Sequence, residues 1–175
     1  MPAARMTASR PRQSIRSRTE CVAETLEGYA RRGVFRGYSQ EPEIRDGRCT
    51  FKLRWHHGRL FELIFDARRN TLRFPRLLPN VPTDSSMYRE LRRFIEQRHS
   101  PELLEHRRID ASKAVASPSN RRGNVALTMR LRAGDDEYVV RKLIHLVHEI
   151  FLVFLQDGRY YEYMVENFDL EPDRF

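Results

Sequence analysis

Three titratable side chains in the last third of the sequence form its most suggestive chemical constellation. His145, His148 and Glu149 have the spacing at which two histidines on one helix can bind a metal ion beside a basic carboxylate. Their order, HxxHE, differs from the HExxH and HxxEH motifs of zinc hydrolases. On a helical wheel His145 lies on the polar face together with Glu149, four residues later. We therefore interpret these two as an ordinary ion pair and predict no metal site.

Two further sets of polar residues could have chemical roles, but their sequence patterns do not favour these roles. His56 and His57 precede Gly58, and consecutive strand residues point to opposite faces, so we interpret them as turn residues. Asp66 and the acidic run 135–137 could be imagined as a magnesium site, but turn and helix-capping roles account for each. The sequence contains no phosphate-binding loop and no nucleophile motif. We accordingly expect a protein that is not an enzyme, with no catalytic residues and no cofactor.

Arginines form the second group of residues that could have a chemical function. A candidate anion-binding surface comprises Arg89, Arg92, Arg93, Arg107 and Arg108, because guanidinium groups recognise phosphates well. These arginines are not interleaved with the aromatic residues of a base-stacking platform, so a solvated helix face is the alternative interpretation.

Most of the net charge lies at the N-terminus. The 175-residue chain has a formal charge of +8, and residues 1–19 hold five arginines and no acid, which leaves +3 for the remainder. Residues 1–17 show no apolar period, so we expect a disordered basic arm that either touches nucleic acid or a membrane or is an unselected tail. Residues 18–175 are predicted to form a single domain. No apolar run is long enough for a membrane span or a secretory signal, which favours a cytoplasmic protein.

Apolar periodicity predicts the elements that position these residues. Helical spacing indicates helices over 19–32, 85–97 and 136–156, and alternation indicates strands over 48–55, 60–65, 72–74, around 109–115 and over 125–131. A short aromatic-rich helix is expected over 160–168. The order α-β-β-β-α-β-β-α, with short polar turns between strands, predicts an α+β fold. Its antiparallel sheet would have about five strands and helices on one face.

The helix predicted over 136–156 carries more apolar surface than one sheet can cover. Its apolar residues fill an arc of roughly 200° at 100° per residue. The first helix, the C-terminal segment or another subunit must cover the surplus. The candidate partner interface comprises Val140, Ile144, Val147, Phe151, Phe154, Tyr160 and Tyr161.

The passage GNVALTMRLRAGDDEYVVRKLIHLVHEIFLVFL, a strand followed by the final helix, resembles stretches of uncharacterised bacterial proteins. Together with the element order, it is similar to the YbjN-type and type III secretion chaperone-like superfamily. This resemblance implies a small, non-enzymatic homodimer that binds a partner polypeptide. The sequence hypothesis is therefore a chaperone-like or adaptor-like protein-binding module. Its alternative is a basic nucleic-acid-binding protein that uses the arm and the arginine-rich helix face.

Overall fold

Alternating strands build one antiparallel sheet in the part of the chain that the computed structural model describes, residues 14–42, 45–133 and 135–169. In β2, Cys49, Phe51 and Leu53 are fully buried, while Lys52 between them is exposed. This alternation gives the sheet one core face and one outer face. The six strands are β1 (Gly37–Gln40), β2 (Arg48–Arg54), β3 (Leu60–Asp66), β4 (Thr71–Leu78), β5 (Ala114–Arg121) and β6 (Asn124–Leu131), in the spatial order β1-β2-β3-β4-β6-β5.

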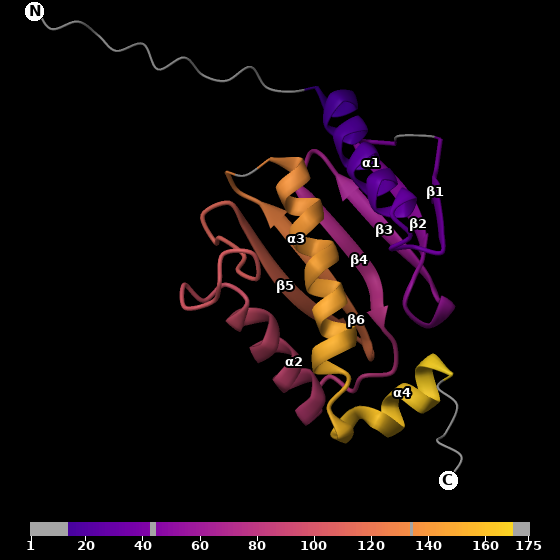
Figure 1. The fold of residues 1–175 in the computed structure, drawn as a ribbon, viewed down its shortest axis with the longest axis vertical. Helices are drawn as coiled ribbons and strands as arrows, with labels where there is room; N and C mark the ends of the chain where they lie inside the picture. Colours follow the sequence, from indigo (N-terminus) through magenta and orange to yellow (C-terminus); the bar gives the residue numbers. More distant parts are fainter. Residues whose placement is uncertain (1–13, 43–44, 134, 170–175) are drawn as a thin grey trace, which may run out of the picture.

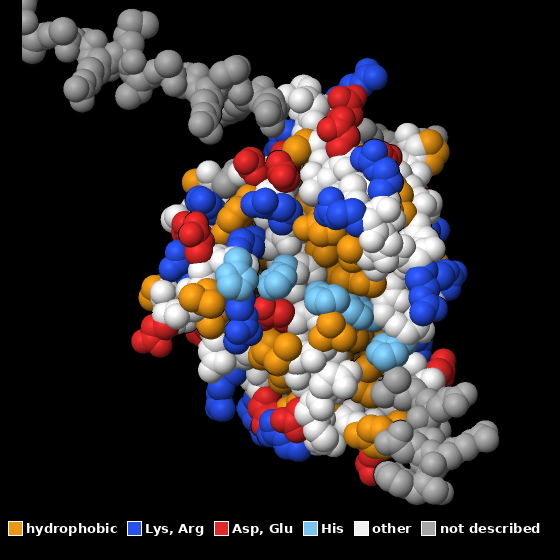
Figure 2. Space-filling view, viewed as in Figure 1, with side chains coloured by type: hydrophobic (Ala, Val, Ile, Leu, Met, Phe, Trp, Pro, Cys, Tyr) orange, Lys and Arg blue, Asp and Glu red, His pale blue; other side chains and the backbone are white. Residues whose placement is uncertain are grey.

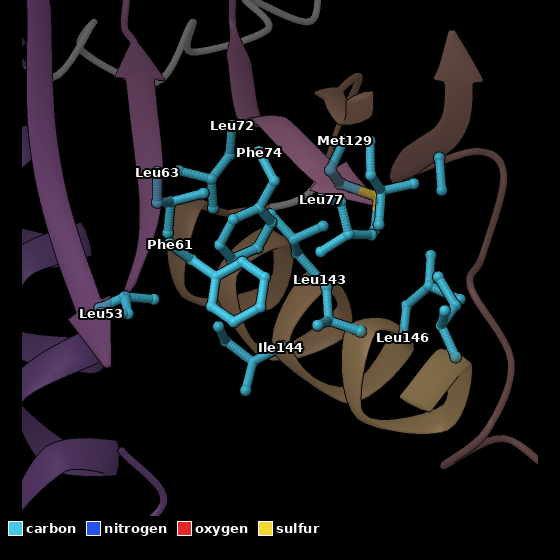
Figure 3. Close-up of a cluster of buried hydrophobic side chains, with 14 of the residues drawn as sticks. Leu53, Phe61, Leu63, Leu72, Phe74, Leu77, Met129, Leu143, Ile144 and Leu146 are labelled. Carbon is cyan, nitrogen blue, oxygen red and sulfur yellow. The ribbon is translucent and has the colours of Figure 1, made fainter. Parts of the chain in front are cut away.

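The helices pack on a single face of this sheet (Figure 1). They are α1 (Ile15–Arg31), α2 (Ser86–Gln97), α3 (Asp136–Glu149) and α4 (Tyr161–Phe168). Helix α3 crosses the middle of the sheet, and Figure 3 shows Leu143 and Leu146 of this helix facing Phe74 and Met129 of the strands. The predicted α+β class with helices on one face is therefore confirmed. No helix in the described ranges combines the length and apolar character that crossing a bilayer requires.

The sheet has six strands rather than the expected five. The missed strand β1 reads GYSQ, which is short and lacks an apolar alternation. The strand predicted over 72–74 extends to Leu78 and includes Pro75. The pairing of β4 with β6 shifts register between Phe74 and Leu78. A proline is tolerated there because an irregular pairing does not need its missing N–H.

Helix α1 begins earlier than predicted, so the expectation of a disordered arm over 1–17 is wrong for its last residues. The Ser17 N–H donates to the Ser14 hydroxyl at 3.1 Å, which caps a helix that starts at Ile15. Arg18 then anchors this helix to the rest of the domain. Its guanidinium donates to both Asp136 oxygens at 2.9 and 3.0 Å and to the Ala67 carbonyl. The predicted arm otherwise falls on residues 1–13, which lie outside the described residues.

The predicted helix 136–156 is an α-helix only as far as Glu149. The chain continues as a π-helical turn over Ile150–Phe154 before the short helix α4. In this turn Phe151 and Phe154 stay buried, whereas Leu152 and Val153 are 51% and 53% exposed. The wider π turn thus leaves two adjacent aliphatic side chains in solvent at the end of α3.

Candidate anion-binding face of the sheet

The sheet face opposite the helices is covered by none of the described helices, and we call it the open face. Its side chains form two rows across the strands. Strand pairing aligns the first row as Arg48, Asp66, Thr71, Arg130 and Val115. The same pairings align the second row as Thr50, Ile64, Arg73, Thr128 and Ser117. Residues that oppose each other on neighbouring strands have Cβ atoms about 5 Å apart, so each row is a continuous line of contacts.

Eight of these ten side chains, all except Val115 and Thr50, line a shallow hollow of about 480 Å³ on the open face. Arginine is the main charged residue in its lining, and four guanidinium groups accompany a single carboxylate, that of Asp66. The complete lining comprises Arg48, Ile64, Asp66, Arg69, Thr71, Arg73, Pro75, Ser117, Ser119, Thr128 and Arg130. The formal charge of the hollow is therefore +3. On the helix side, by contrast, basic and acidic side chains are interspersed (Figure 2).

Asp66, the carboxylate of the hollow, is already saturated by hydrogen bonds. Its oxygens accept from the Arg48 side chain at 3.0 Å and from the backbone N–H groups of Arg68 and Arg69 at 3.1 and 3.0 Å. Burial by itself would raise the pKa of Asp66, but these donors hold the pKa below its ordinary value. Asp66 thus pairs with Arg48, lies 4.0 Å from the Arg69 guanidinium and closes the β3–β4 turn, and it forms no ion pair with Arg73 or Arg130.

Arg73 and Arg130 are the two uncompensated cations at the centre of the hollow. Arg73 pairs with Thr128, and Arg130 lies two residues further along β6, so the arginines are diagonal neighbours. Such neighbours have Cα atoms roughly 7–8 Å apart. Both side chains are exposed, and within the described part of the chain neither forms a hydrogen bond or an ion pair. Two free guanidinium groups side by side are suited to an anion that bridges them.

Hydroxyl groups surround the two free arginines. Among the described residues, the side chains of Thr71, Thr128 and Ser117 have no hydrogen-bond partner, and all three line the hollow. A hydroxyl donates one hydrogen bond and can turn to suit its acceptor. Arginine forks combined with free hydroxyls can bind phosphate or carboxylate oxygens.

The arginines predicted to form the anion-binding surface do not lie on the open face. Arg89, Arg92 and Arg93 are exposed on α2, on the helix side of the molecule. The Arg107 side chain instead donates to Glu149 at 3.4 Å, and Arg108 donates to the Pro101 carbonyl at 3.3 Å. Arg89 likewise donates to the Asp84 carbonyl at 2.9 Å, so internal acceptors engage three of the five predicted arginines, and their anion-binding role stays a prediction.

The predicted partner interface on the last helix is also wrong for most of its residues. Val140, Ile144, Val147, Phe151, Phe154 and Tyr160 are all buried within the chain, and only Tyr161, 42% exposed, reaches solvent. Helix α1 packs along α3, and Tyr160 and Phe168 close over its end. The surplus apolar arc is thus covered by the chain's own α1 and C-terminal segment, two of the alternatives that its width left open.

The histidine and glutamate constellation is an internal ion-pair network. His145 lies 2.9 Å from Glu149, as the predicted i, i+4 pair requires. Glu149 is buried and also accepts from Arg98 at 2.8 Å, which ties the end of α2 to α3. Burial would raise the pKa of Glu149, but the hydrogen bond from Arg98 and the positive charges around it hold the pKa below its usual range. Within the described ranges, histidine, cysteine and acidic side chains nowhere gather in a group of three that could hold a metal ion.

His56 and His57 do form a turn, but His56 is more than a turn residue. Its ring stacks on Phe151 with centroids 4.3 Å apart and lies beside Trp55 at 4.5 Å. Burial, followed by the nearby rings of His148 and His57, lowers the pKa of His56 to about 4. The half-buried ring is therefore neutral at physiological pH.

Sequence reasoning missed the open face because it followed charges along helices. The relevant signal was present in the strand passages TLRFP and LTMRL, where threonine and arginine occupy the polar positions. These positions converge only through the pairing of β4 with β6, which are separated in the sequence by α2 and β5. Comparisons with protein-family models, with curated proteins and with solved structures find no match to this chain.

Proposed function

We propose that this chain is a non-catalytic binding module that holds an anionic partner against its open face. The observation that carries the proposal is the free pair Arg73 and Arg130, set among hydroxyls in a hollow of formal charge +3. The only carboxylate of that lining, Asp66, is already neutralised within the chain. The adaptor-like function implied by the element order is compatible with such a surface.

Fluorescence anisotropy with labelled anionic polymers tests this proposal. The probes are a polyglutamate peptide and short nucleic acids, each titrated with the full chain. The double variant Arg73→Gln/Arg130→Gln should weaken the binding of any anion that occupies the hollow by tenfold or more, since each charge-assisted hydrogen bond contributes about 1.5–3 kcal/mol. The matched control, Arg92→Gln/Arg93→Gln on α2, removes the same charge and should keep near-normal affinity. Equal losses in the two variants would contradict a site on the open face.

A second candidate function, binding to a second copy of the chain, rests on the exposed end of α3. Leu152 and Val153 are both more than half exposed, close in sequence to the exposed Tyr161. Adjacent apolar side chains of this kind are typical of protein contacts. Light scattering at micromolar concentration should then give the mass of a dimer, and Leu152→Asp should give a monomer. A monomeric wild-type protein would exclude this candidate.

A further inference from the structure

The chemistry of the open face also indicates which anion it holds. We infer that the open face binds the sugar–phosphate backbone of a nucleic-acid duplex. This inference rests on the proposed function, because it assigns a partner class to the same hollow. Three features of the face carry it: the spacing of the free cations, the nature of the other outward side chains, and the closed edge of β5.

The free cations are arranged for more than one phosphate group. Arg73 and Arg130 are diagonal neighbours roughly 7–8 Å apart at Cα, a separation comparable with that of successive phosphates along a strand. Each guanidinium presents a fork of N–H donors that matches phosphate oxygens. Thr128 lies opposite Arg73 and Thr71 lies opposite Arg130, so each arginine has a free hydroxyl directly across from it. Arginine, serine and threonine side chains are the usual protein contacts of nucleic-acid phosphates.

The outward side chains do not suit a single strand. Proteins that bind single strands without sequence preference stack the bases on aromatic side chains. The polar faces of β2, β3, β4, β5 and β6 present no aromatic residue among the described positions, and all the rings of β2 and β3 point into the core. A duplex needs no such platform because its bases stack on each other, and its phosphates remain available on the surface.

An acidic polypeptide fits the surface less well than a duplex does. Peptides commonly join a sheet as an additional strand, but the edge of β5 is closed. The Ala116 N–H there donates to the ring of His99 at 3.0 Å, the Ala114 N–H donates to the Asp110 carbonyl, and Pro118 has no N–H to offer. Among the described residues, the open face also lacks the aromatic anchors on which protein partners usually depend.

The unbound protein carries a small electrostatic penalty at this site. Two like charges whose Cα atoms lie roughly 7–8 Å apart repel each other, and no described carboxylate forms an ion pair with Arg73 or Arg130. A structural role would make both residues stabilising, whereas a binding role predicts the opposite. The double variant Arg73→Gln/Arg130→Gln should therefore melt at the wild-type temperature or slightly above it. A lower melting temperature would assign these arginines to the fold and overturn the inference.

Salt-dependent binding provides the direct test. Labelled RNA and DNA duplexes, the matching single strands and polyglutamate are titrated with the full chain at several salt concentrations. We expect the wild type to bind a duplex more tightly than either other probe. Log affinity falls linearly with log salt concentration, and each phosphate contact contributes about 0.9 to the steepness of this fall. The double variant, which loses two contacts, should therefore have a salt dependence that is shallower by about 2. The control Arg92→Gln/Arg93→Gln should retain the wild-type slope. Equal affinity for duplex and single strand, or an unchanged slope in the double variant, would overturn the inference.

A variant without a charge change tests the hydroxyls. Thr71→Val/Thr128→Val keeps side-chain shape and strand preference while it removes two hydrogen-bond donors from the hollow. Duplex affinity should fall several-fold with an unchanged salt slope, and unchanged affinity would show that the hydroxyls make no contact. If polyglutamate binds in an Arg73- and Arg130-dependent way and duplexes do not, the proposed function stands and the nucleic-acid inference fails. If no probe binds, both fail.

Discussion

Replacement of His56 by phenylalanine should remove a pH dependence of stability that originates in one half-buried ring. His56 lies against Phe151 and Trp55, and its Nε2 atom is buried without a hydrogen-bond partner. Phenylalanine can occupy the same stacked position and leaves no polar atom unpaired. The variant therefore changes the titration of this site more than its packing.

The magnitude follows from the pKa of His56, which burial lowers from its ordinary value of 6.5 to about 4. The unfolded chain takes up this proton near pH 6.5 and the folded chain only near pH 4. His56 thus contributes stability that is fully present above pH 6.5 and is lost as the pH falls from 6.5 towards 4. A shift of roughly 2.5 units corresponds to at most ~3.4 kcal/mol at about 1.36 kcal/mol per unit. Since the ring is half-buried, solvent screening reduces the expected effect to about 1.5–2 kcal/mol.

Urea unfolding followed by far-ultraviolet circular dichroism at pH 7 and pH 4.5 measures this effect. The free energy of unfolding of the wild type should decrease from pH 7 to pH 4.5. In His56→Phe this decrease should be smaller by about 1–2 kcal/mol. His106→Gln serves as the control because His106 is exposed, and it should retain the wild-type pH dependence. If His56→Phe and the wild type lose the same free energy, the ring is not held neutral by its surroundings and the reasoning is refuted.

Three further predictions about the packing of the fold are tested by urea unfolding. Glu149→Gln should cost about 3 kcal/mol or more, because it leaves the buried Arg98 guanidinium without its carboxylate; a loss below 1 kcal/mol would contradict this. Since the pKa of Glu149 is held low, the stability that the ionised Glu149 side chain contributes should disappear as the pH falls through that lowered pKa. Arg18→Ala should destabilise the protein by about 2–4 kcal/mol, whereas Arg16→Ala, which breaks an exposed pair, should cost less than about 0.5 kcal/mol; similar losses in the two would refute the assigned roles. His57→Gly should be neutral or stabilise by up to ~1 kcal/mol, because His57 has a positive φ of 55°, and a clear loss of stability would count against strain at this turn.

The sequence predicts much of this fold where periodicity is strong. The alternation of Cys49, Phe51 and Leu53 correctly identifies β2 and its buried face. The helix predicted over 85–97 agrees closely with α2, which begins after Ser85, whose hydroxyl accepts from the Tyr88 N–H. Periodicity does not reveal β1, because its four residues become a strand only through pairing with β2. It also hides the path of β4 through Pro75, which depends on an irregular pairing with β6.

The candidate site was harder to predict because it is made by long-range pairing. Arg73 and Arg130 are separated by 57 positions in the sequence, and only the β4–β6 ladder makes them neighbours. The width of the apolar arc on α3 correctly indicated that further elements must cover it. It could not distinguish a second subunit from the chain's own α1 and C-terminal segment, which bury Phe151 and Phe154 in this structure. Burial of this kind depends on where the later helices turn, and no local pattern encodes that.

Backbone amide chemical shifts, recorded while the full chain is titrated with a short nucleic-acid duplex, test the central claim most directly. The account predicts that the largest perturbations map to the central strands of the open face, around Thr71, Arg73, Thr128 and Arg130. Amides of α2 around Arg92 should change little. Perturbations confined to α2 or to the exposed end of α3, with the central strands unchanged at saturation, would contradict an anion-binding function of the open face.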